Sequence, residues 1–190
     1  LAAEAPEQLL GDLDRLLAGQ FAVERRIMLR AQAPGGEFRW ALNDVVVGKP
    51  LYGRMARIRT SLDGDHIATF PADGLIVATA TGSTAFNLSA GGPIVDARMA
   101  AMSLTPICPH TLYSRPLLVP AEVQVTMQLA GDGKERPEAV VFVDGQELCS
   151  LREGDEVHVT RAERDALLVR LGESRFYGRL REKLRWGTER

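Results

Sequence analysis

The chain has 190 residues, of which 45% are hydrophobic and 25% charged, an ordinary composition for a globular protein with a buried core. Its formal net charge of -2 provides no basic surplus, so we expect neither a nucleic-acid partner nor an anionic membrane partner. The apolar runs are too short to span a bilayer and the two cysteines, Cys108 and Cys149, suit a reducing compartment, so we expect a cytoplasmic location.

The first residues indicate a helix that leads into the rest of the chain. The chain begins Leu1-Ala2-Ala3-Glu4 without an initiator Met, and we expect another segment to precede it. Residues 6–18 carry leucines at helical spacing between Pro6 and Gly19, which is a favourable start and stop for a helix. We therefore treat residues 1–19 as a helical lead-in.

From residue 20 to about residue 172 the sequence alternates between apolar and polar residues, as strands do. Segments flanking turn sequences predict four hairpins: 21–32 with 37–48, 56–62 with 66–70, 122–130 with 139–145, and 155–162 with 166–172. Four hairpins with few helices between them predict a mainly β, antiparallel fold. We favour a two-sheet sandwich over a barrel, although the spacing fits both.

The tail, residues 173–190, predicts an amphipathic helix. Phe176, Leu180 and Leu184 fall on one face, with Arg and Lys on the other and Gly187 as a stop. An apolar helix face of this kind requires a cover, which this domain, another domain or another subunit could supply.

Residues 73–94, "DGLIVATATGSTAFNLSAGGPI", combine a buried strand with a cluster of hydroxylated residues. The strand ends at Thr81-Gly82-Ser83-Thr84, and a short helix follows. Backbone N–H groups and hydroxyls at such a junction favour phosphate or ribose oxygens. The alternative is that Ser83 or Thr84 only caps the helix, and the two roles are compatible.

This segment closely resembles the signature of the NAD kinase family, whose members use ATP or, in some cases, polyphosphate. Two further stretches agree in the family's order, "ALNDVVV" at 41–47 and "LTPICPHTLYSRPLLVP" at 104–120, so the resemblance covers nearly the whole chain. It implies phosphorylation of the 2′-hydroxyl of the adenosine ribose of NAD to give NADP. It also implies a divalent cation, usually Mg²⁺, that arrives with ATP, and a homodimer or homotetramer.

The resemblance also implies what this chain lacks. The family has an N-terminal α/β domain with a Gly-Gly-Asp-Gly motif, whose aspartate acts as the base, followed by a β-rich domain. The sequence contains no such motif, so we expect no catalytic residue here and no turnover by the 190 residues alone. We expect three parts: the lead-in 1–19 from that missing domain, a β-rich NAD-binding domain at 20–172, and the C-terminal helix and tail at 173–190. The alternative is a non-catalytic nucleotide-binding domain of the same fold.

The resemblance implies twelve NAD contacts, and His110 has no second His or Cys at metal-ligand spacing, so we expect no metal ligand in this chain. The expected contacts are Asn43, Asp44, Arg54, Asp73, Thr81, Thr84, Ala85, Phe86, Asn87, Leu88, Ser89 and Gln146. An Asn-Asp pair suits ribose, because a carboxylate accepts from two hydroxyls while an amide donates and accepts; the pair could instead only bend a strand. Phe86 stands where the family usually has Tyr, so it keeps the ring and loses the hydroxyl.

Overall fold

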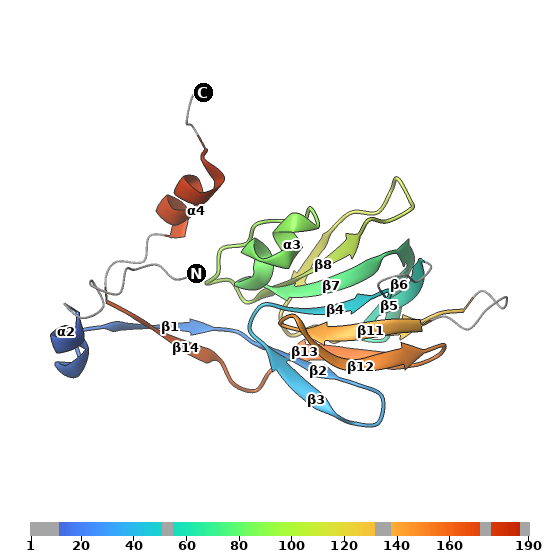
Figure 1. Ribbon diagram of the computed structural model, residues 1–190, viewed down its shortest axis with the longest axis horizontal. Helices are drawn as coiled ribbons and strands as arrows, with labels where there is room; N and C mark the ends of the chain where they lie inside the picture. The colour runs from blue at the N-terminus through green and yellow to red at the C-terminus, as the bar shows by residue number, and fades with distance from the viewer. Residues whose placement is uncertain (1–11, 51–54, 132–137, 172–175, 187–190) are drawn as a thin grey trace. The chain divides into compact units, whose positions relative to one another are not determined.

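The computed structural model describes residues 12–50, 55–131, 138–171 and 176–186 (Figure 1). Contacts divide the chain into a body, residues 26–166, and a second unit formed by its two ends, residues 1–25 and 167–190. The predicted boundaries after residues 19 and 172 stay a prediction. In the division by contacts, residues 20–25 and 167–171 belong to the same unit as the chain ends.

The body consists of two six-stranded sheets whose described pairings are all antiparallel. The first sheet contains, in spatial order, β3 (Phe38–Ala41), β2 (Leu29–Gln32), β13 (Glu156–Arg161), β10 (Val125–Leu129), β5 (Ala56–Leu62) and β6 (Asp65–Ala72). The second contains β12 (Gln146–Arg152), β11 (Glu138–Val143), β4 (Asp44–Gly48), β7 (Gly74–Thr79), β8 (Ala101–Ile107) and β9 (Leu117–Pro120). The predicted mainly β fold with two packed sheets is confirmed.

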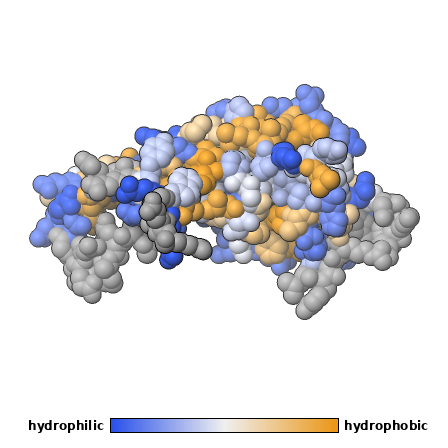
Figure 2. All heavy atoms as spheres, turned by 90° about the horizontal axis from the view of Figure 1, so that it is seen from above, coloured by the Kyte–Doolittle hydropathy of each residue, from blue (hydrophilic) through white to orange (hydrophobic). Residues whose placement is uncertain are grey.

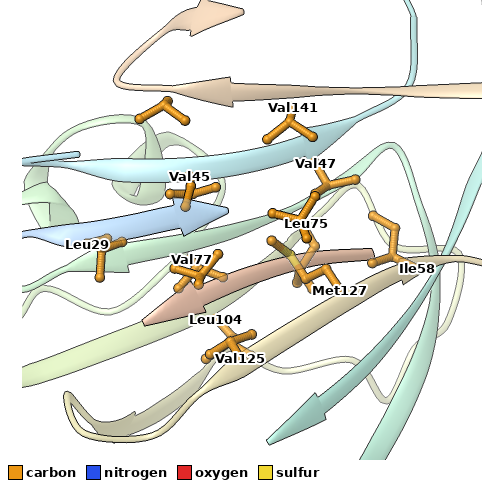
Figure 3. Packing of buried hydrophobic residues seen from close by; sticks show 14 of the residues in the cluster. Leu29, Val45, Val47, Ile58, Leu75, Val77, Leu104, Val125, Met127 and Val141 are labelled. Atoms are coloured by element: carbon orange, nitrogen blue, oxygen red, sulfur yellow. The ribbon is translucent and has the colours of Figure 1, made fainter. Parts of the chain in front are cut away.

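The core lies between these sheets because alternate residues of each strand point inward. In β5 the burial alternates from Ala56 onward, and in β10 Val125, Met127 and Leu129 are buried while the residues between them are not. Figure 3 shows apolar side chains from both sheets, among them Val77 and Met127, in the same space. The period-two pattern therefore identified the inward faces correctly.

Two of the four predicted hairpins are confirmed and two are wrong. β2 pairs with β3, and β5 pairs with β6 across Asp63-Gly64, whose φ angles are 48° and 91°. β10 and β11 do not form a hairpin, because they lie in different sheets, and β13 pairs with β10 and β2 while β14 pairs with β1. The turn that follows β11 is instead Asp144-Gly145, with φ angles of 48° and 77°, and it connects β11 to β12.

β7 is buried along its whole length, as the sequence predicted. Leu75 and Val77 face the core between the sheets. Ile76 and Ala78 face the other way and form a second apolar cluster with Val46. Beyond β7 the chain forms the short 3₁₀ helix η1 (Gly82–Thr84) and α3 (Phe86–Ser89), which Figure 1 draws at the end of this strand.

Among its described residues, the second unit contains a two-stranded sheet and two helices. The strands are β1 (Ala22–Arg26) and β14 (Ala166–Arg170), and the helices are α2 (Leu13–Leu17) and α4 (Phe176–Leu184). α2 ends as predicted at Gly19, where the N–H groups of Gly19 and Gln20 bond back to Leu16 and Arg15 in a Schellman pattern. The rest of the predicted 6–18 helix before residue 12 lies outside the described residues, and α4 confirms the predicted C-terminal helix.

Apolar side chains also reach the surface, as the orange areas of Figure 2 show. Those of the body include Phe86, Leu112, Tyr113, Leu117 and Leu118. Among the helices described, none combines the length and apolar character that crossing a bilayer requires.

Candidate functional site

Asn43 lies at the bend where the chain leaves β3 in the first sheet and enters β4 in the second. Thr79, at the end of β7, fixes this bend from one side: its N–H donates to the Asn43 carbonyl at 2.8 Å, and its hydroxyl donates to the Leu42 carbonyl at 2.6 Å. The side chains of Asn43 and Asp44 make no hydrogen bond within the described part of the chain. They are therefore available for a ligand.

Asp144 fixes the same bend from the other side. Its carboxylate accepts hydrogen bonds from three consecutive backbone N–H groups: Leu42 at 2.7 Å, Asn43 at 2.8 Å and Asp44 at 3.0 Å. The N–H of Asp144 in turn donates to the Asp44 carbonyl at 3.0 Å. Sequence reasoning missed this residue, because an Asp-Gly pair after a strand indicates a turn and does not reveal which distant backbone the carboxylate contacts.

Asp44 is the most perturbed acid of the site. It begins β4 and is 5% exposed. Burial, and second the negative charge of Asp144, raise the pKa of its carboxyl from the ordinary value of 3.8 to about 6. A carboxylate kept in such surroundings is costly, and perturbed acids of this kind are more frequent at functional sites than elsewhere.

The junction after β7 packs directly against the bend. The Thr79 hydroxyl accepts from the Gly82 N–H at 3.0 Å. A Cβ on Gly82 would lie 2.1 Å from the Asn43 carbonyl oxygen, so only glycine permits this approach. The hydroxyl oxygen of Thr81, the preceding residue, is buried and has no hydrogen-bond partner among the described residues. An orphaned hydroxyl at this place is a candidate donor to a ligand.

The alternative reading of Ser83 and Thr84 as helix caps is wrong. The N-cap residues of η1 and α3 are Thr81 and Ala85, and neither helix has a side-chain cap bond. The Ser83 hydroxyl instead donates to the Ala80 carbonyl at 2.7 Å and accepts from the Val95 N–H at 3.0 Å. Ser83 therefore anchors the junction to the segment that follows α3.

Asn87 is fully used inside the protein. It has no exposed surface, and its amide NH₂ donates to the carbonyls of Ser83 at 3.3 Å and Pro93 at 3.2 Å. Its side-chain oxygen accepts from the hydroxyls of Ser103 at 3.1 Å and Thr105 at 2.7 Å. Of the residues predicted to contact the ligand, Asn87 is thus placed to hold α3 against β8.

The other predicted contacts of the junction lie on its outer side. Thr84 and Leu88 are partly buried, while Ala85, Phe86 and Ser89 are exposed. The Phe86 ring is 47% exposed at the start of α3, which leaves a face for stacking on a planar ligand.

Of the remaining predicted residues, Gln146 lies near the bend and Asp73 lies far from it. Gln146 begins β12 two residues after Asp144, on the turn that contacts the bend. Asp73 precedes β7, so the six residues of that strand, roughly 20 Å, separate it from the Thr79 end; its carboxylate pairs with the Lys49 ammonium at 2.7 Å. Arg54 lies outside the described residues.

Metal-ligating residues do not cluster in the part of the chain that the structure describes. No group of three or more His, Cys, Asp or Glu side chains there has an arrangement that could hold an ion. Cys108 and Cys149 are free thiols, and burial raises the pKa of Cys149 above its ordinary value.

Comparison with known proteins identifies the family. The family model described as "ATP-NAD kinase C-terminal domain" matches residues 42–171. The NAD kinase of Moorella thermoacetica is 47% identical over 186 residues, which is 96% of this chain and 59% of that protein. The chain spans about 60% of the length of the curated relatives that it matches.

Solved structures agree with the fold. The crystal structure of yeast NADH kinase complexed with NADH superposes with a TM-score of 0.88 at 25% identity, covering 97% of this chain and 55% of that one. The structure of an NAD kinase from Archaeoglobus fulgidus in complex with ATP gives a TM-score of 0.77 at 27% identity, covering 95% and 67%.

Proposed function

The chain belongs to the ATP-NAD kinase C-terminal domain family, and from this premise we propose that it forms the NAD-binding part of an NAD kinase. The complete enzyme transfers a phosphoryl group from ATP or polyphosphate to the 2′-hydroxyl of the adenosine ribose of NAD, giving NADP. The observation that supports this best is the convergence of the Asn43-Asp44 bend and the Thr81-Gly82 junction at the end of β7.

Each residue of this cluster has a part that its chemistry allows. The Asp44 carboxylate accepts from ribose hydroxyls, and the Asn43 amide both donates and accepts. The free Thr81 hydroxyl donates to a ligand oxygen, and the exposed Phe86 ring stacks on the base. We include Thr84, Ala85, Leu88, Ser89 and Gln146 as further contacts and give Asn87 a supporting role, since its polar atoms are already bonded.

In this proposal the position of Asp73 is connected with the oligomeric state of the protein. Asp73 lies a strand length away from the rest of the site, so we infer that it serves NAD bound by a second copy in a homodimer or homotetramer. The cytoplasmic location and the contact from Arg54 stay predictions from the sequence.

The divalent cation and the catalytic base belong to other parts of the enzyme in this proposal. The described residues provide no fitting cluster for a cation, and we expect Mg²⁺ to arrive bound to ATP. The family's Gly-Gly-Asp-Gly motif is absent from the 190 residues, so the base comes from outside this chain. That absence also favours the second candidate function for the chain taken alone, a nucleotide-binding domain without catalysis.

NADP formation distinguishes these functions. The complete protein, incubated with NAD, ATP and Mg²⁺, is expected to make NADP, measured by an NADP-specific dehydrogenase cycling assay, with polyphosphate tested as a second donor. Residues 1–190 alone are expected to make none. NADP formed by those residues alone would refute the assignment of the base, and none from the complete protein would favour the non-catalytic alternative.

A further inference from the structure

The backbone of the bend at Leu42–Asp44 forms hydrogen bonds to residues that are distant in the sequence. Residues 42 and 43 lie between β3 and β4, at the change from one sheet to the other, and their N–H groups have no partner in a neighbouring strand. Hydrogen bonds from backbone N–H groups to a carboxylate are stronger than those to a neutral acceptor, so they can fix the backbone even where it is partly exposed. The Asp144 carboxylate satisfies the N–H groups of Leu42, Asn43 and Asp44, and it comes from a turn about a hundred residues further along the chain.

At this bend the backbone groups are bonded inside the protein, whereas the side chains of Asn43 and Asp44 are not. Thr79 donates to the carbonyls of Leu42 and Asn43, and the Asp144 carboxylate accepts from the N–H groups. With the backbone bonded on both sides, the Asn43 amide and the Asp44 carboxyl stay free of bonds to described residues. Because the backbone that carries these two side chains is already fixed, it loses little conformational entropy when a ligand binds.

We propose that Asp144 is a positioning residue for the nucleotide: its carboxylate holds the Leu42–Asp44 backbone so that Asn43 and Asp44 meet the ribose of NAD in a fixed geometry. This role rests on the proposed function. Asp144 acts through its neighbours and touches neither the substrate nor the reacting atoms.

The charge of Asp144 adds a second effect that a purely structural residue would not have. It faces Asp44, on which it acts together with burial to raise the pKa to about 6. Among the other strands packed on β4, β7 carries no titratable side chain, and Glu138 lies at the far end of β11. Arg39 on β3 donates instead to the Glu147 carbonyl at 2.9 Å.

The test compares Asp144→Asn with Asp63→Asn in the complete protein. Asp63 is a closely matched control, because it also precedes a hairpin glycine, also has φ 48°, and also accepts a backbone N–H through its carboxylate, from Gln124 at 2.8 Å. Both variants lose a carboxylate charge, but only Asp144→Asn must leave a backbone N–H without its acceptor: Asp144 uses both oxygens for the bend, whereas one amide oxygen is enough for the single N–H bonded at position 63. We expect the Kd for NAD, measured by titration calorimetry, to rise about tenfold or more in Asp144→Asn and less than twofold in Asp63→Asn.

The pH profile provides the readout specific to positioning and charge. In the unchanged protein NAD affinity should fall as the pH drops through about 6, because a protonated Asp44 no longer accepts from both ribose hydroxyls. In Asp144→Asn this fall should move to lower pH. An affinity and a pH profile equal to those of the unchanged protein would overturn the proposal.

Two further outcomes are informative. If Asp144→Asn does not fold, Asp144→Glu replaces it: the charge stays, the carboxylate moves by one methylene, and we expect weaker NAD binding with little change in the pH profile. Unchanged NAD affinity in that variant would also overturn the proposal. Failure of the unchanged protein to bind NAD would reject the proposed function itself, which separates that failure from a failure of Asp144 alone.

Discussion

At the residue scale, Asp44 illustrates a site residue that costs stability. Its carboxyl has a pKa of about 6 in the folded protein against 3.8 ordinarily, so the folded state binds the proton more tightly than the unfolded chain. The free energy of unfolding therefore falls as the pH rises from about 4 to about 6, and the cost above pH 6 is at most roughly 3 kcal/mol. A residue kept despite this cost fits a role in binding.

Asp44→Asn should stabilise the protein at neutral pH and weaken NAD binding. We expect the free energy of unfolding to rise by about 1–3 kcal/mol at pH 7, and the gain to shrink as the pH falls and to vanish below about pH 3, where Asp44 is protonated in both states. Urea denaturation at several pH values measures this. Asp65→Asn, at an exposed aspartate, should change the free energy by less than about 0.5 kcal/mol, and a gain for Asp44→Asn that did not depend on pH would contradict the explanation.

The Asn87 side chain forms hydrogen bonds with four other residues: Ser83, Pro93, Ser103 and Thr105. Asn87→Ala leaves the hydroxyls of Ser103 and Thr105 without their acceptor and two carbonyls without a donor. We expect a loss of about 2–4 kcal/mol in the free energy of unfolding, measured by chemical denaturation. Ser89→Ala, on the exposed side of the same helix, should be nearly neutral for stability. Equal stability of the two variants would contradict the role assigned to Asn87.

At the scale of elements, the β7–η1 junction depends on close contact with the bend. Gly82→Ala would place a Cβ 2.1 Å from the Asn43 carbonyl oxygen, so the junction or the bend must move. We expect a loss of about 3 kcal/mol or more in the free energy of unfolding together with weaker NAD binding. Denaturation and calorimetry of the same samples measure both.

Gly48 in β4 provides the matched control for that substitution. It is also buried, yet a Cβ there would meet its nearest atom, the Asp73 carbonyl oxygen, at 3.9 Å, an ordinary contact. Gly48→Ala should change the free energy of unfolding by less than about 1 kcal/mol. If both glycine variants behaved alike, the close approach at Gly82 would not be the cause.

At the scale of the whole molecule, stability comes from the apolar layer between the two sheets. Leu75 has no exposed surface and lies in this layer, whereas Leu112 is 86% exposed. Leu75→Ala should lower the free energy of unfolding by about 2–5 kcal/mol and Leu112→Ala by less than about 0.5 kcal/mol. Thermal and urea unfolding of both variants test this, and a small effect of Leu75→Ala would contradict the placement of the core.

The sequence by itself determined much of the local structure. Continuous apolar residues predicted that β7 is buried on both faces, Asp63-Gly64 predicted a hairpin, and Gly19 predicted the end of α2. The motif at 73–94 predicted the family that the comparisons then identified. Each of these depends on neighbouring residues, so a short stretch of sequence contains the necessary information.

Only the tertiary structure decided which distant segments meet. The alternation of apolar and polar residues indicates which face of a strand points inward, but it does not indicate which strand pairs with it. For this reason β10 and β11 were predicted as a hairpin although they lie in different sheets. The bonds from Asp144 to residues 42–44, and those from Ser103 and Thr105 to Asn87, likewise join parts of the chain that no local pattern connects. Side-chain hydrogen bonds of this kind depend on how the sheets pack, and that packing is fixed by the whole chain at once.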